Sequence, residues 1–136
     1  MLGIVLVTHG RLGDEFRAAL EHIIGPQQQI EAISIAPEDD LNLCRGDIIE
    51  AIHRVDSGDG VAILTDIFGG TASSLAITCM NRPKVDMLAG MNLPMLVKLA
   101  KVRQGRSLPE AVGMAEAAGR KYVTIASAWL PSSTPR

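Results

Sequence analysis

Two apolar runs in the sequence end at side chains that could react together. Residues 2–7 form a continuous apolar run that stops at Thr8, His9 and Gly10, and residues 61–64 form another that stops at Thr65 and Asp66. Continuous apolar runs of this length are typical of strands that are covered on both faces in a parallel sheet. If the two strands are neighbours, the imidazole and the carboxylate emerge at the same edge of that sheet.

This pair of side chains predicts a specific chemistry. A carboxylate that binds one ring nitrogen of a histidine fixes the tautomer and leaves the other nitrogen free as a nucleophile or base. Gly69, Gly70 and Thr71 come just after Asp66 and just before a predicted helix. Their backbone N–H groups and the Thr71 hydroxyl suit an anion such as phosphate. A nucleophilic His9, an orienting Asp66 and an anion-binding turn together predict a phosphohistidine site.

Each of these residues also has an ordinary structural interpretation. A histidine at a strand end can be structural, Asp66 can cap a turn, glycine pairs are common in turns, and Thr71 is a normal helix cap. Their joint occurrence at two matching strand ends favours the functional interpretation. The two other histidines, His22 and His53, lie beside the apolar stripes of their predicted helices, so we expect both to be exposed and inert.

Strands alternate with amphipathic helices along the chain. Strands are predicted at residues 2–7, 30–36, 61–65, 85–89 and 122–126, and helices at residues 14–24, 41–55, 71–81, 94–104 and 107–119. This alternation predicts an α/β three-layer sandwich with a mostly parallel sheet in strand order 2-1-3-4. Ligands of such sheets bind beyond the carboxyl ends of the strands, where the strand order reverses. His9 and Asp66 are expected at that point.

Composition excludes several other classes of protein. The 136 residues suit one domain, and a chain that is 47% apolar but only 3% aromatic predicts an aliphatic core. The net charge of −2 with mixed signs argues against nucleic acid as a partner. The N-terminal apolar run is too short to span a membrane, so a cytoplasmic location is expected. Cys44 and Cys79 stand alone and are expected to be buried, and no metal site is predicted.

Three segments in register resemble a known family. They are Thr8-His9-Gly10, then Thr65-Asp66-Ile67-Phe68-Gly69-Gly70-Thr71, then Ala89-Gly90-Met91-Asn92-Leu93-Pro94-Met95-Leu96. Together they are similar to the IIA component of the mannose-type sugar phosphotransferase system, over residues 1–126, with residues 127–136 left as a tail. Two positions depart mildly from the family pattern, which often has Trp where Phe68 stands and Ser or Asn where Thr71 stands.

The resemblance implies roles for individual residues. His9 would take phosphate from the phosphocarrier protein HPr and pass it to a histidine of a separate IIB protein, and Asp66 would hold the ring. Gly70 and Thr71 would lie beside the phosphate, and Asn92 and Pro94 would form a site wall. No cofactor is implied.

The resemblance also implies an assembly. It predicts a homodimer in which residues 122–126 form a strand that pairs antiparallel with the partner's sheet, and only indirect contact with a membrane permease. Transport and regulatory roles both remain open, as does the sugar. The alternatives are a non-catalytic regulatory or anion-sensing module and a IIA-like subunit of a dihydroxyacetone kinase system.

Overall fold

Four parallel strands form the central sheet of the computed structural model, which describes residues 1–82 and 84–131. The strands are β1 (Gly3–His9), β2 (Ile30–Ile35), β3 (Val61–Thr65) and β4 (Val85–Ala89). They lie in the order β2-β1-β3-β4, and every neighbouring pair is parallel. The predicted order and direction of these four strands are therefore confirmed.

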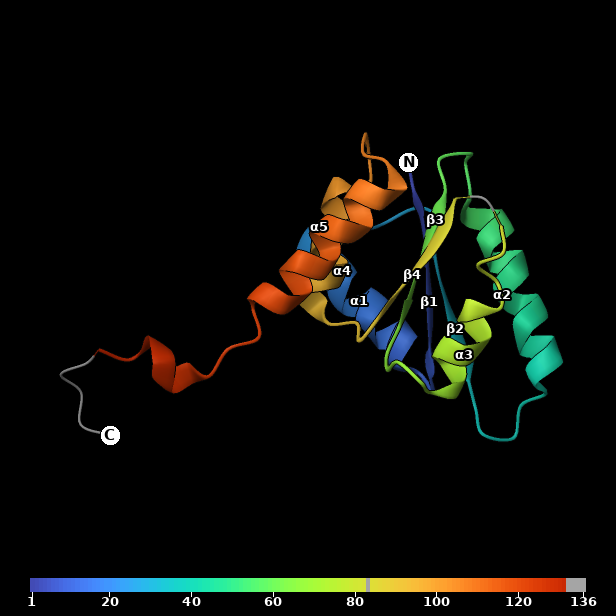
Figure 1. Ribbon diagram of the computed structural model, residues 1–136, viewed down its shortest axis with the longest axis horizontal. Coiled ribbons are helices and arrows are strands. Elements are labelled where there is room, and N and C mark those ends of the chain that lie inside the picture. The colour runs from blue at the N-terminus through green and yellow to red at the C-terminus, as the bar shows by residue number, and fades with distance from the viewer. Residues whose placement is uncertain (83, 132–136) are drawn as a thin grey trace.

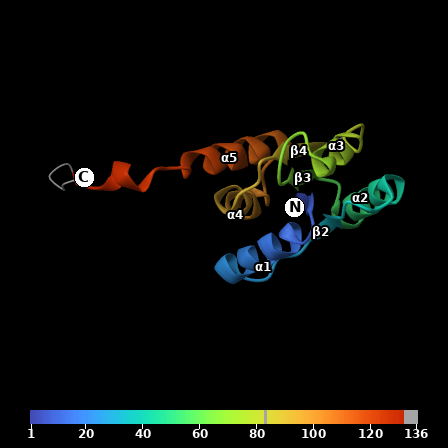
Figure 2. The same cartoon turned by 90° about the horizontal axis from the view of Figure 1, so that it is seen from below.

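Helices cover both faces of this sheet. They are α1 (Leu12–Ile24), α2 (Leu41–Val55), α3 (Thr71–Ile77), α4 (Leu93–Val102) and α5 (Leu108–Lys121). Figure 1 shows α1, α4 and α5 on one side of the sheet and α2 and α3 on the other, and the view in Figure 2 separates the same three layers. The predicted three-layer α/β sandwich is confirmed.

The sheet buries a separate aliphatic cluster on each face. Because successive side chains of a strand point to opposite faces, Ile4 and Leu6 of β1 pack with α1, α4 and α5, whereas Val5 and Val7 pack with α2 and α3. All four side chains are fully buried. This arrangement explains why β1 has a continuous apolar sequence rather than an alternating one, and it makes β1 a rigid support for the residue at its end.

The side chain of Arg103 fixes the end of the sheet that lies far from His9. It is 1% exposed, and it donates hydrogen bonds to the carbonyl oxygens of Leu2 (3.2 Å), Gln28 (2.5 Å) and Gln29 (3.1 Å) and to Oε1 of Gln27 (3.1 Å). Burial lowers the pKa of this guanidinium. These bonds tie the end of α4 to the starts of β1 and β2, so the helices and the sheet hold one relative position.

Helix boundaries follow local capping where the sequence supplies a cap. The Asp40 side chain accepts hydrogen bonds from the N–H groups of Asn42 and Leu43 at the start of α2, and Ser107 accepts one from Glu110 at the start of α5. Helix α3 is shorter than predicted and ends at Ile77. The next N–H groups bond carbonyls three residues back, and the Thr78 hydroxyl donates to the Leu75 carbonyl (2.6 Å), which closes α3 in a tight turn.

Residues 122–126, predicted as a strand that is exchanged with a partner copy, do not form a strand in a single copy of the chain. Tyr122 forms a turn, Val123 to Ile125 have no regular structure, and residues Ala126–Trp129 form a short 3-10 helix. A strand needs an edge to pair with, and this segment instead leads away from the sheet (Figure 1). Of the predicted tail at residues 127–136, the last five residues lie outside the described part of the structure. No helix in that described part could cross a membrane.

Candidate active site

His9 and Asp66 meet at the carboxyl rim of the sheet. His9 is the last residue of β1 and Asp66 follows β3, and the pairing of Val7 with Thr65 brings the two strand ends level. Oδ2 of Asp66 lies 3.0 Å from Nδ1 of His9 and accepts a hydrogen bond from the His9 backbone N–H (2.9 Å). Its other oxygen, Oδ1, accepts from the Ile67 N–H (2.9 Å). The carboxylate is therefore held on both oxygens.

Asp66 is an anionic acceptor at neutral pH. Its side chain is 11% exposed, and burial on its own raises the pKa of the carboxyl group. The hydrogen bonds from the His9 N–H, the His9 ring and the Ile67 N–H outweigh burial and hold the pKa of Asp66 below its ordinary value. Because a carboxylate only accepts hydrogen bonds, Nδ1 of His9 must carry the proton, and Nε2 keeps a free lone pair. The His9 side chain is 45% exposed, so a partner can approach it.

Gly70 packs directly against the reactive edge of the imidazole. A Cβ atom built on Gly70 would lie 2.8 Å from Cε1 and 3.3 Å from Nε2 of His9, and 3.0 Å from Cγ2 of Ile67. The backbone of Gly70 (φ −80°, ψ 175°) is one that any residue adopts. The reason for glycine here is therefore the close approach of the ring, not the conformation of the turn.

Replacement of Gly70 by alanine is expected to displace the His9 ring without straining the backbone. A shift of about 1 Å in a reacting group can cost about 10²-fold in rate, so we expect a loss of that order in any reaction at the His9 ring. Gly69 provides the matched control, because its φ of +88° strains an alanine although no atom lies within 4 Å of the added Cβ. Single-turnover rates and thermal melts of both variants separate the two effects. Equal rates for wild type and Gly70→Ala would contradict the role of this contact.

Two hydroxyl groups that the sequence did not single out shape the loops around His9. Ser73 is buried, and its Oγ accepts from the Gly69 N–H (2.8 Å) and donates to the Gly70 carbonyl (3.2 Å). The Gly69 N–H is thus taken, which removes it from the predicted anion-binding turn. Thr8 Oγ1 accepts from the Gly13 N–H (2.7 Å) and joins the end of β1 to the first turn of α1. Nothing in the positions of Thr8 and Ser73 along the sequence distinguishes them from serines and threonines that make no such hydrogen bonds.

A cleft of about 370 Å³ opens beside the imidazole. It is lined by His9 and Thr71 together with residues from the end of β2, the loop after it and the start of α2. Leu41 lines this cleft and is 50% exposed, although its helical spacing predicts an inward position. Leu41 is exposed because α2 begins at this residue, so its side chain borders the cleft instead of the core.

Asn92 and Pro94 do not line the His9 cleft. The Asn92 side chain makes two hydrogen bonds within the fold, where Oδ1 accepts from the Met95 N–H (3.0 Å) and Nδ2 donates to the Gly119 carbonyl (2.9 Å). Pro94 lies in the first turn of α4 and lines a groove against α5. Asn92 therefore caps α4, and a site wall at these two positions stays a prediction.

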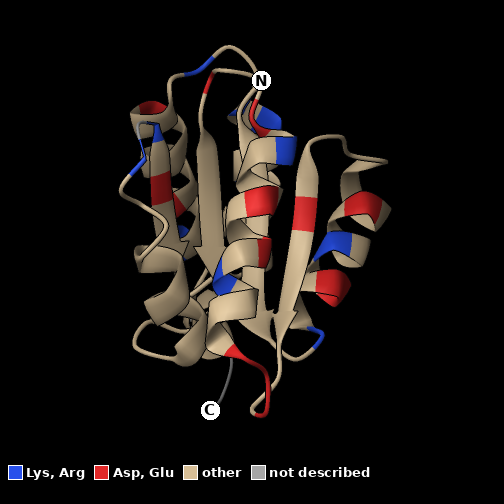
Figure 3. Ribbon diagram, turned by 90° about the vertical axis from the view of Figure 1, so that its right-hand side faces the viewer, with Lys and Arg blue, Asp and Glu red and all other residues tan. Residues whose placement is uncertain are grey.

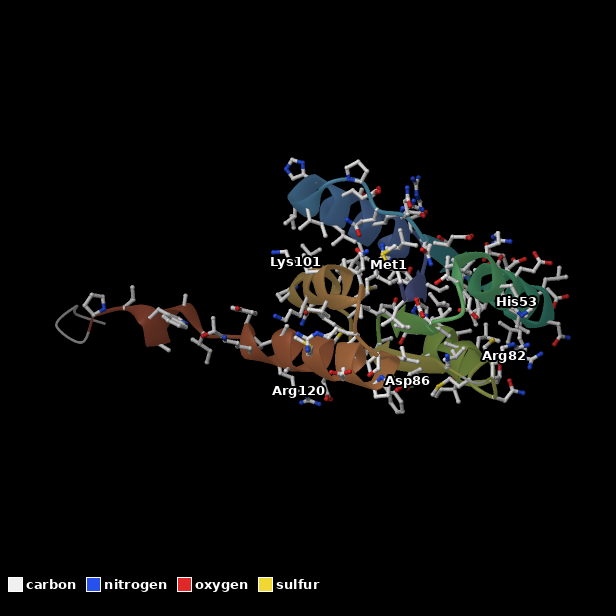
Figure 4. The ribbon with its side chains drawn as sticks, turned by 90° about the horizontal axis from the view of Figure 1, so that it is seen from above. Met1, His53, Arg82, Asp86, Lys101 and Arg120 are labelled. Atoms are coloured by element: carbon white, nitrogen blue, oxygen red, sulfur yellow. The ribbon has the colours of Figure 1, made fainter. Side chains whose placement is uncertain are left out.

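The remaining histidines and cysteines do not line the His9 cleft. His22 and His53 are exposed on α1 and α2, as predicted, and Figure 4 shows His53 on the outer side of the molecule. Cys44 and Cys79 are both buried, as predicted. Burial, followed by the nearby Asp39, Asp47 and Asp40, raises the pKa of the Cys44 thiol, so this group is not a thiolate at neutral pH.

Comparison with known proteins gives one consistent result. A family model described as PTS system fructose IIA component (EIIA-man) matches residues 3–116. A sorbose-specific EIIA component of Lacticaseibacillus casei is 30% identical over 110 residues, which cover 80% of this chain and 79% of that protein. A fructose-specific EIIA component of Bacillus subtilis is 22% identical and covers 93% of this chain and 88% of its own.

The solved structures agree with the fold. The mannose/sorbose-specific IIA subunit from Enterococcus faecalis superposes with a TM-score of 0.85 at 25% identity, covering 98% of each chain. The family match spans both strand ends, where Nδ1 of His9 and Oδ2 of Asp66 lie 3.0 Å apart. The chain therefore belongs to the EIIA-man family and is an EIIA component of the sugar phosphotransferase system (PTS).

Proposed function

We propose that Nε2 of His9 accepts a phosphoryl group from phosphorylated HPr and passes it to a histidine of a IIB protein. The main support for this proposal is that the two ring nitrogens of His9 have different surroundings. Asp66 binds Nδ1, whereas Nε2 borders Gly70 on a half-exposed ring. A free, outward nitrogen is what an exchange between proteins requires, because each partner must reach the same atom in turn.

The transfer balances without a further reactant. The Nε2 lone pair of His9 attacks phosphorus, and the P–N bond of the donor histidine breaks with its electron pair staying on the donor ring. The His9 ring gains positive charge, and Asp66 stabilises that charge through the Nδ1 proton. Transfer to a IIB histidine is the same step in reverse. Catalysis then consists of positioning and charge stabilisation, as is general for phosphoryl transfer.

The direct test is labelling of the purified protein with phosphoenolpyruvate, enzyme I and HPr. We expect one acid-labile, alkali-stable phosphoryl group per chain, which a IIB protein then removes. An anion-sensing module would instead bind inorganic phosphate without becoming labelled. The relatives are named for two different sugars, sorbose and fructose. We therefore expect the IIB and membrane partners to determine which sugar this chain serves.

Exposed apolar side chains around His9 form a surface suited to protein docking. We call Leu41, Ile67 and Phe68 the apolar rim; they are 50%, 58% and 72% exposed. Leu41 lines the His9 cleft, and Ile67 approaches Gly70 beside the ring. Apolar groups this exposed next to a reactive atom are expected to contribute to partner binding. Figure 3 views the molecule from the side of α2, and acidic and basic residues both occur along that helix.

Replacement of Leu41 or Phe68 by aspartate is expected to raise KM for phosphorylated HPr about tenfold each, with kcat little changed. The fold should remain intact because both side chains are exposed. Ile23→Asp is the matched control, since Ile23 is 54% exposed near the end of α1 that is remote from His9. Steady-state kinetics with purified HPr measures the effect. A loss in Ile23→Asp equal to that in Phe68→Asp would show that surface charge alone is responsible.

We also infer a homodimer built on the segment after α5. Residues 122–130 are all exposed and include Val123, Ile125 and Trp129, which are 74–78% exposed. Strand β4 is an edge of the sheet, and a cavity of about 430 Å³ runs beside it. A second copy's segment could add a strand there and bury these side chains. Light scattering is expected to give a dimer for the whole chain and a monomer after removal of residues 122–136.

A further inference from the structure

A second depression, separate from the His9 cleft, lies between α4 and α5. Its volume is about 500 Å³, and much of its lining is apolar, including Val97, Met114 and Ala118. Three lysines, Lys98 and Lys101 from α4 and Lys121 from α5, also line it. Figure 4 places Lys101 on α4. The lining shares no residue with the His9 cleft or with the cavity beside β4, so a bound molecule here would leave both free.

The charge in this groove is unbalanced. No carboxylate lines it, and within the described residues none of the three lysines forms an ion pair. The Lys121 ammonium instead lies 5.4 Å from the centre of the Tyr122 ring. On the neighbouring face of α5, by contrast, Arg120 pairs with Glu116 at 3.2 Å. The groove therefore combines apolar lining with positive charges that have no anionic partner.

We propose that this groove binds a small organic anion with an apolar body, such as an alkyl or aryl phosphate or carboxylate. Its volume falls within the range of about 300–1,000 Å³ that is usual for ligand pockets. The apolar body would cover Val97 and Met114 while the anionic group meets the lysines. The exposed segment of a second copy is the poorer occupant, because residues 122–136 contain no Asp or Glu to meet the three lysines.

The test uses n-octyl phosphate as the probe. Its binding is monitored by changes in amide chemical shifts and by calorimetry at low salt. We expect shifts confined to residues 94–101 and 114–122, and a dissociation constant below about 1 mM. n-Octyl glucoside supplies the same chain without charge, and inorganic phosphate supplies the charge without the chain. Each is expected to bind at least about tenfold more weakly, since each makes only half of the contacts.

Two sets of variants separate charge from shape. The triple change Lys98→Gln, Lys101→Gln and Lys121→Gln is expected to weaken octyl phosphate about tenfold, whereas Lys84→Gln, at an exposed lysine outside the groove, changes nothing. Ala117→Trp fills the groove from an exposed helical position and should block binding. Ala18→Trp is its control at an exposed position of α1. Labelling of His9 should be unchanged in all four variants.

Three outcomes would overturn the proposal. Shifts centred on His9 and Thr71 would place the anion in the His9 cleft. Equal binding of octyl phosphate and octyl glucoside would reduce the groove to a non-specific apolar surface. A change of oligomeric state in Ala117→Trp or in the triple variant would assign the groove to contact between copies. Because His9 labelling is measured in parallel, failure here is distinguishable from failure of the proposed phosphoryl transfer.

Discussion

Replacement of His9 by glutamine is expected to abolish phosphoryl labelling by phosphoenolpyruvate, enzyme I and HPr. Glutamine can still reach Asp66 with its amide, but it has no nucleophilic nitrogen to form a P–N bond. The fold should survive, because the His9 side chain is 45% exposed and contributes no atoms to either aliphatic cluster. Autoradiography after a short incubation measures the label, and circular dichroism with thermal melting checks the fold.

The chain supplies its own controls for this experiment. It has three histidines, and the other two, His22 and His53, are exposed on helices. His22→Gln and His53→Gln are therefore expected to label like the wild type. Phosphorus-31 spectra of the labelled wild type should show attachment at Nε2, since Nδ1 is bound to Asp66. Label that persists in His9→Gln, or attachment at Nδ1, would move the reaction away from the arrangement described above.

The position of the site was predictable because parallel strands end at one rim. The apolar runs that end at His9 and Asp66 identify two strands, and the alternation with helices makes them parallel. Register then follows, and the structure brings Nδ1 of His9 and Oδ2 of Asp66 to 3.0 Å. The two residues could be paired from the sequence because strand ends are anchored by buried apolar residues on both faces, which leave little freedom in the backbone.

Features that depend on the space around an element were not predictable. Helical spacing gives Leu41 an inward direction, but it does not reveal that the first residue of α2 borders the His9 cleft. The apolar sequence of residues 122–126 has the composition of a strand, but a strand forms only where an edge is offered. The family motif links Asn92 to the site, but it does not reveal that Oδ1 of Asn92 caps α4. In each case the outcome depends on a contact with another part of the molecule, which local sequence preferences do not reveal.

Replacement of Asp66 by asparagine is expected to slow transfer through His9 by about 10²-fold or more. The two Asp66 oxygens accept from backbone N–H groups of His9 and Ile67, and one of them also holds the ring. An amide has only one oxygen. If that oxygen faces Ile67, its NH₂ group faces Nδ1 and favours the tautomer with the proton on Nε2, which removes the nucleophile. If it faces His9, the Ile67 N–H loses its acceptor.

Acid titration gives this prediction a second readout. The folded pKa of Asp66 is depressed, so its contribution to stability is full above the unfolded value of about 3.9 and is lost as the pH falls through the folded value. At neutral pH we expect Asp66→Asn to lower the free energy of unfolding by about 1–3 kcal/mol, the usual cost of leaving a buried hydrogen-bonding group without a partner. The difference from wild type should shrink below about pH 4. Denaturant titrations at both pH values measure it.

Nitrogen-15 shifts of the His9 ring separate positioning from simple support of the fold. In the wild type the proton should reside on Nδ1, and in Asp66→Asn a substantial fraction should move to Nε2, in step with the loss of rate. Asp47→Asn, at an exposed position of α2, is the matched control and should alter neither quantity. If Asp66→Asn lowered stability while leaving the tautomer and the transfer rate unchanged, Asp66 would be a turn residue, and the ring would owe its reactivity to Gly70 and the strand end alone.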